Sequence, residues 1–344
     1  MDRKLFLALI ALPLSVSANS YNQQYENLFP SSVYNNDANF WNSDKISIGY
    51  RHSSGEFDYT YSGENFDLSA VNPGCTSNCS GLLFPKTTGK QDYSINMVSV
   101  KLKGNLGNDF FYRMRYETNV DGSSDVVETN TINSQSPSTG NERETALRIS
   151  STTDDITKDN FEFLLGKKSN SRNFYNFNYY LGLGYHNEEF YTQKPTVEQN
   201  THNVNLNLNN DVYNQYESES YIVKVGIGAR ERVAQNILFN GRALVYPYIQ
   251  YDATSKYQSR RDALQPFNAE LEGDGWGYNL RADLTYLFSY RASISVFYEF
   301  DHKNIDGDTN LTYSNNGNIV NTQSSLDSFE SNDHNIGVDF NLYF

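Results

Sequence analysis

The last nine residues of the chain alternate between apolar and polar side chains. Ile336, Val338, Phe340, Leu342 and Phe344 are separated by Gly337, Asp339, Asn341 and Tyr343. Because successive side chains of a β-strand point to opposite faces, this period of two predicts a strand with one apolar face. Nine residues is also about the length that a tilted strand needs to cross a membrane. The segment therefore favours a sheet with one face against hydrocarbon.

The same alternation recurs along the chain and predicts ten strands. The candidates are residues 46–51, 93–103, 110–117, 161–166, 177–186, 221–230, 242–257, 278–286, 292–300 and 335–344. Two of them, 93–103 and 242–257, carry apolar residues in both phases. The connections alternate in length: 104–108, 167–173, 231–240 and 289–290 are short, whereas 63–91, 121–159, 192–219, 258–274 and 304–332 are long. Short turns at one rim and long loops at the other predict an all-β, antiparallel up-and-down transmembrane barrel, with eight or twelve strands as alternatives.

The N-terminus carries the pattern of an export signal. Arg3 and Lys4 precede an apolar run over residues 5–16, and the small residues Ser17 and Ala18 follow this run. A basic start, a short apolar run and small residues at the end predict a signal peptide over residues 1–18. Residues 19–43 are then expected to form a periplasmic extension, and residues 44–344 the barrel. Cys75 and Cys79 are a candidate disulfide, since the periplasm is oxidising.

Composition excludes one large class of partner. The formal net charge is −14, and nucleic-acid binding needs clustered Lys and Arg, so no nucleic-acid partner is expected. Aromatic residues make up 15% of the chain, although the mean hydropathy is only −0.65. A secreted β-sandwich would share this composition but has no reason to sort its connections by length. Composition therefore agrees with strands that are apolar on one face.

The last strand and three short motifs point to a class of protein. Gly337, Phe340, Leu342 and the terminal Phe344 resemble the signal that the barrel assembly machinery of the outer membrane reads. From about residue 161 onward, the stretches 180–185 (YLGLGY), 216–221 (YESESY) and 273–278 (GDGWGY) resemble those of a largely uncharacterised group of Gram-negative outer-membrane β-barrel proteins. The resemblance implies an outer-membrane location in contact with lipid and lipopolysaccharide. It implies no activity, and an extracellular ligand or a host or phage surface partner stays open.

If the apolar positions face lipid, the opposite positions face the lumen. This phase predicts an inward charge network of Arg51, Arg113, Arg115, Glu117, Glu162, Lys224, Arg230, Arg281, Asp283, Glu299, Asp301 and Asp339. A ten-stranded barrel is little wider than an eight-stranded one, whose interior side chains can fill. The charges are therefore expected to pair as a plug. The protein is then a structural or surface-interaction barrel acting through its extracellular loops, with a narrow porin-like diffusion channel as the alternative.

The histidines argue against an enzyme. Omptin-like surface proteases use an Asp-x-His pair opposite paired aspartates, and no Asp-x-His occurs in the chain. Asp301-His302 and Asp333-His334 are adjacent, so their side chains point to opposite faces of a strand. Omptin-like hydrolysis is therefore a minor alternative. No cofactor or metal motif is present, because no complete ligand spacing occurs.

Overall fold

The computed structural model describes most of the region expected to form the barrel. The described residues are 43–62, 86–107, 109–136, 140–153, 156–169, 176–200, 212–234, 236–257, 267–289, 291–315 and 318–344. The expected signal peptide, nearly all of the N-terminal extension, and Cys75 and Cys79 lie outside these residues. The first described strand begins one residue after the expected start of the barrel.

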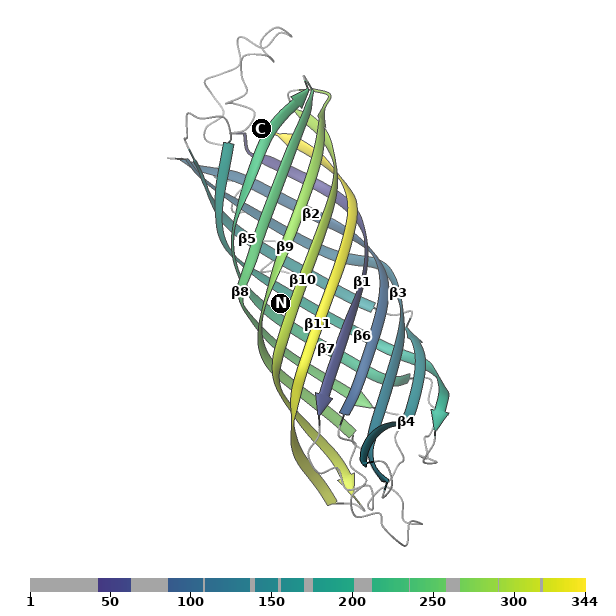
Figure 1. Cartoon of the computed structure of the whole chain (residues 1–344). Coiled ribbons are helices and arrows are strands. Elements are labelled where there is room, and N and C mark those ends of the chain that lie inside the picture. Colours follow the sequence, from purple (N-terminus) through teal and green to yellow (C-terminus); the bar gives the residue numbers. More distant parts are fainter. Residues whose placement is uncertain are drawn as a thin grey trace, which may run out of the picture.

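Eleven antiparallel strands close into a ring (Figure 1). They are β1 (Lys45–Ser62), β2 (Lys86–Gly107), β3 (Phe110–Ser136), β4 (Gly140–Thr153), β5 (Ile156–Lys168), β6 (Asn176–Asn200), β7 (Val212–Ala234), β8 (Ile237–Tyr257), β9 (Phe267–Leu287), β10 (Ala292–Asn315) and β11 (Asn318–Tyr343). β4 and β5 both pair with β3 on one side and β6 on the other, so they share one place in the ring. The ring thus has ten strand positions, which confirms the predicted up-and-down barrel.

The ring closes between the first and last strands. β1 and β11 pair from Lys45 and Tyr343 to Ser62 and Ser325. Figure 1 shows them side by side, purple beside yellow. Both ends of the barrel sequence lie at the rim of the short turns, which is the periplasmic rim in barrels of this kind.

The connecting segments at the other rim are long, as predicted, but much of their length is strand. β10 and β11 stay paired out to Asn315 and Asn318, and β3 and β4 out to Ser136 and Gly140. The interpretation of residues 121–159 and 304–332 as loops was wrong for these parts. Beyond the lipid the outward face of a strand meets water and carries polar side chains, so the alternation weakens while the backbone pairing continues, although inward residues such as Leu311 and Leu326 stay buried.

An apolar belt surrounds the periplasmic part of the barrel. On β6 the outward Leu181 and Leu183 are 58% and 60% exposed, and on β11 the outward Ile336 is 61% exposed. Aromatic rings flank the belt: Phe288 and Phe340 stack at the periplasmic edge, and Trp276, Tyr278 and Phe300 lie at the extracellular edge. Amphipathic and aromatic rings favour the headgroup boundary, so the belt marks the lipid contact. Among the described residues, no helix is long and apolar enough to cross a membrane.

The interior contains apolar side chains as well as charges. Ile95 and Met97 of β2, with Leu244 and Tyr246 of β8, are fully buried inside the ring. These two strands showed apolar residues in both phases of their sequence. One apolar set faces lipid and the other faces the core of the barrel, which explains the pattern.

Candidate functional site: the filled lumen

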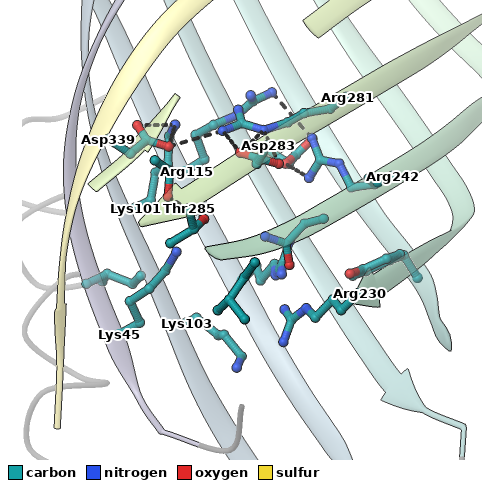
Figure 2. A pocket seen from close by; sticks show the side chains of 18 of the residues that line it. Lys45, Lys101, Lys103, Arg115, Arg230, Arg242, Arg281, Asp283, Thr285 and Asp339 are labelled. Carbon is teal, nitrogen blue, oxygen red and sulfur yellow. Dashed lines mark hydrogen bonds and ion pairs between the residues drawn. The ribbon is translucent and has the colours of Figure 1, made fainter. Parts of the chain in front are cut away.

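A network of charged side chains crosses the lumen at the level of the belt. Glu299 of β10 lies 2.9 Å from Arg115 of β3 and 2.9 Å from Arg281 of β9. Arg281 also lies 2.7 Å from Asp283 and 3.1 Å from Asp339 of β11, as Figure 2 shows. Because three strands separate β3 from β10 around the ring, the Arg115–Glu299 pair spans the interior.

A second set of ion pairs surrounds Glu162 of β5. Its carboxylate lies 3.0 Å from Lys224 of β7 and 3.1 Å from Arg242 of β8. It also lies 3.6 Å from Arg115, which joins this set to the Glu299 set. Arg51 pairs with Glu117 at 3.0 Å. Several partners for each charge offset the cost of removing it from water, so the network can persist in a filled interior.

The structure brings together nine of the twelve charged residues that the sequence placed inside. They are Arg51, Arg115, Glu117, Glu162, Lys224, Arg281, Asp283, Glu299 and Asp339. Arg113 and Arg230 lie inside as well, but nearer the periplasmic rim, where they line a cavity. Asp301 accepts a hydrogen bond from Tyr246 on the extracellular side of the network.

A polar layer lies on the extracellular side of the network. Lys158 of β5 lies 3.6 Å from Asp333 of β11, and Tyr93 donates a hydrogen bond to the same carboxylate. Lys303 of β10 lies 2.9 Å from the Nδ1 atom of His186 of β6. These contacts also join strands that are not neighbours, so this layer is a second set of side chains that crosses the lumen.

An aromatic plug closes the lumen above this polar layer. We define the plug as Phe57, Phe190, Tyr216, Tyr251 and Phe329, which come from β1, β6, β7, β8 and β11. The ring centroids of Phe57 and Phe329 are 5.5 Å apart, and those of Phe57 and Tyr216 are 6.1 Å apart. β1 and β7 are on opposite sides of the ring, with four strand positions between them either way. The Phe57–Tyr216 contact therefore bridges the full diameter.

Sequence reasoning missed several members of these layers. Lys101 lies 2.7 Å from Asp339, and Arg242 lies 3.1 Å from Glu162, yet both belong to the two strands with mixed phase. The phase could have been set through β1, because Ile46 points outward and pairs with Leu102, which leaves Lys101 and Lys103 inward. No comparable signal marks the aromatic plug, since an inward Phe and an outward Phe look alike in the sequence.

The described histidines do not form the arrangement of an omptin-like site. His52, His302 and His334 occupy outward positions, and their Nδ1 atoms lie within 3.1 Å of Asn96, Asn332 and Tyr298. His186 is inside, but Lys303 is its side-chain neighbour. Among the described residues no group of three or more His, Cys, Asp or Glu is arranged to hold a metal ion.

Comparison with known proteins supports the fold. No family model and no curated protein sequence matches the chain. The outer membrane protease OmpT from Escherichia coli has a similar structure, with a TM-score of 0.65 and 10% identity over 88% of this chain and 97% of that chain. The translocator domain of the autotransporter NalP from Neisseria meningitidis matches with a TM-score of 0.36 and 7% identity, over 97% of this chain and 95% of that one.

The closed ring, its apolar belt and the likeness to OmpT define the class of protein. The chain is a Gram-negative outer-membrane β-barrel, located in the outer membrane and in contact with its lipids. A shared fold at 10% identity assigns no activity, so the role has to be argued from the lumen and the surface of this chain.

Proposed function

We propose that this protein is a closed barrel that presents paired strands at the cell surface for contact with an external partner. The observation that carries the proposal is the filled lumen. The Arg115–Glu299 pair and the Phe57–Tyr216 contact each reach across the interior, at two different levels. A solute would have to displace these two layers, and the polar layer between them, to pass.

The free space inside the barrel is divided in the same way. A cavity of about 110 Å³ lies on the periplasmic side of the ion pairs. Two cavities of about 30 Å³ each adjoin the aromatic plug, one lined by Tyr93 and His186 and the other by Gln91 and Glu128. Each smaller cavity has room for a few water molecules, and side chains separate it from the larger one. This division favours a plug over a continuous pore.

The extracellular strands offer the surface for the proposed contact. β10 and β11 continue about fifteen residues beyond Phe300, which at about 3.3 Å per residue is about 50 Å along the strand. Exposed carboxylates lie on the extracellular parts of several strands, as on Glu56 of β1, Glu217 of β7 and Glu330 of β11. A hydrogen bond to Glu56 raises the pKa of Lys90 above its ordinary value, so this lysine stays charged. The acidic surface suits a cationic partner, or divalent cations that bridge it to lipopolysaccharide.

Planar-bilayer conductance of the refolded protein tests the closed lumen. We expect no single-channel steps from the native chain. A combined variant, Phe57→Ala/Phe329→Ala with Arg115→Ser/Glu299→Ser, is the positive control, because it shortens the plug and removes both members of one ion pair. Clear steps from the native chain, at the size seen for the opened variant, would contradict the proposal.

Binding of a fluorescent oligolysine peptide to whole cells tests the acidic surface. We expect binding to fall when Glu56, Asp92, Glu217 and Glu330 are changed to their amides. The matched control replaces the uncharged hairpin tip, residues 309–324, with Asn-Gly, which keeps the carboxylates and should keep the binding. Equal binding to cells with and without the protein would rule out a cationic partner.

A narrow diffusion channel is the second candidate, favoured by the charged side chains that line the cavity of about 110 Å³ at the periplasmic end of the lumen. The conductance of the native chain decides between the two.

Surface proteolysis is a third candidate, because OmpT shares the fold. Peptide cleavage by whole cells, lost on His52→Ala or His302→Ala, would support it.

A further inference from the structure

The cavity at the periplasmic end of the lumen has an unusual charge. Eight of its lining residues are cationic and only three are acidic. The cations are Lys45, Lys101, Lys103, Arg113, Arg115, Arg230, Arg242 and Arg281, and the acids are Glu162, Asp283 and Asp339. The chain as a whole carries a formal charge of −14, so this excess is local and opposite in sign to that of the protein.

The three carboxylates are already engaged at the inner side of the cavity. Asp283 and Asp339 each contact Arg281, and Asp339 also contacts Lys101. Glu162 contacts Lys224 and Arg242. These three carboxylates therefore neutralise cations of the belt-level network. That network contains at least as many cations as carboxylates.

A second tier of cations lies nearer the periplasmic rim. Figure 2 shows Lys45, Lys103 and Arg230 around one space, and Lys45 donates a hydrogen bond to the side-chain oxygen of Asn341. The positive charges of Arg230, Arg113 and Lys45 all act on Lys103. The Nε atom of Arg113 is buried and has no hydrogen-bond partner among the described residues. Like charges gathered in a partly buried space repel one another, so a mobile anion there would stabilise the fold.

We propose that this cavity, which we call the cationic vestibule, binds a small oxyanion carrying a phosphate group. Arg and Lys together suit phosphate, because guanidinium groups donate paired hydrogen bonds and ammonium groups act as point charges. The volume of about 110 Å³ is on the order of seven times what one water needs, which gives room for one compact anion. The phosphate can be free in the periplasm or belong to a lipid headgroup at the rim.

The test uses the refolded full chain in an uncharged detergent, at fixed ionic strength maintained with chloride. One arm titrates inorganic phosphate and the other titrates a soluble short-chain phosphatidic acid, each followed by calorimetry. Saturable binding in the first arm indicates a free anion, and binding in the second arm alone indicates a lipid headgroup. Both results support the site.

The variant Lys103→Gln/Arg230→Gln removes two cations of the vestibule and is expected to weaken binding at least tenfold, or about 1.4 kcal/mol. The matched control, Lys90→Gln/Lys256→Gln, removes two cations from exposed pairs with Glu56 and Glu217 and should bind like the native chain. If the double variant does not fold, Lys45→Gln replaces it, with a smaller loss expected. The proposal fails if the native chain binds neither ligand, or if vestibule and control variants bind equally well.

Discussion

Glu299→Gln is the change that most directly tests the ion pairs of the lumen. The side chain of Glu299 is 2% exposed, and its Oε2 atom lies 2.9 Å from both Arg115 and Arg281. Its Oε1 atom accepts a hydrogen bond from Asn279. Glutamine keeps the shape of glutamate, but it removes the charge and turns one oxygen into an NH₂ group. That group would face donors, because Arg115, Arg281 and Asn279 all donate.

The expected loss of unfolding free energy follows from the charges of Arg115 and Arg281, which stay buried in the variant. Arg115 keeps Glu117 at 3.8 Å and Glu162 at 3.6 Å, so both remaining contacts are longer than the one it loses. Removing one partner of a buried pair typically costs about 3–5 kcal/mol. Arg281 keeps Asp283 and Asp339, which places the expected loss near the lower end, at about 3 kcal/mol.

Urea unfolding of the protein in lipid vesicles measures this loss by linear extrapolation. The control is Glu56→Gln, the same substitution in a pair with Lys90 whose side chains are 44% and 50% exposed. An exposed pair is worth at most about 1 kcal/mol. The double variant Arg115→Gln/Glu299→Gln should cost less than the sum of its single variants, because neither charge is left unpaired. If Glu299→Gln costs no more than Glu56→Gln, the reasoning is refuted.

Three further predictions concern the belt, the packing and the assembly of the barrel. Leu181→Arg, in the middle of the belt, should lower the free energy of unfolding by about 2–4 kcal/mol in the same urea assay. Asn187→Arg, further along the outer face of β6, should lower it by less than about 1 kcal/mol. Equal losses would show that the belt does not lie at Leu181. Gly182→Ala should lower the folded yield, since a Cβ there would lie 2.1 Å from the Phe163 carbonyl oxygen, while Gly241→Ala, whose nearest contact is 3.6 Å, should fold normally in a heat-modifiability gel. Phe344→Ala should slow insertion of the chain by purified assembly machinery. Its free energy of unfolding in urea should change little, because the ring is 57% exposed. Insertion at the native rate would show that Phe344 is not part of an assembly signal.

The sequence predicted the barrel where strands touch lipid. In β9, β10 and β11 the outward residues meet hydrocarbon and the inward ones meet charges, so alternation was visible and ten strand positions followed. The same phase placed Arg281, Glu299 and Asp339 on one face, and the structure joins them. Phe297, in that polar phase, lies inside with its ring 3.8 Å from the Arg281 guanidinium.

Other features left no comparable trace in the sequence. Tyr93, Ile95 and Met97 are buried inside the ring, which hid the phase of β2 and with it the inward Lys101 and Lys103. The outer strand extensions meet water on their outward face and bury only scattered apolar residues such as Leu311 and Leu326 on the inward face, so no regular alternation separates strand from loop in the sequence. The Phe57–Tyr216 contact joins residues far apart in the chain, and only the closed ring brings them together.

The placement of the lumen charges has a consequence for how the ring shuts. Inward charges on β1 to β3 are mostly positive, as on Arg51, Lys101 and Arg115, whereas those on β10 and β11 are mostly negative, as on Glu299 and Asp339. A half-built sheet would therefore carry opposite signs along its two free margins. We expect attraction between these margins to favour their approach before the last backbone hydrogen bonds form, and to disfavour pairing of one margin with the like margin of a second molecule.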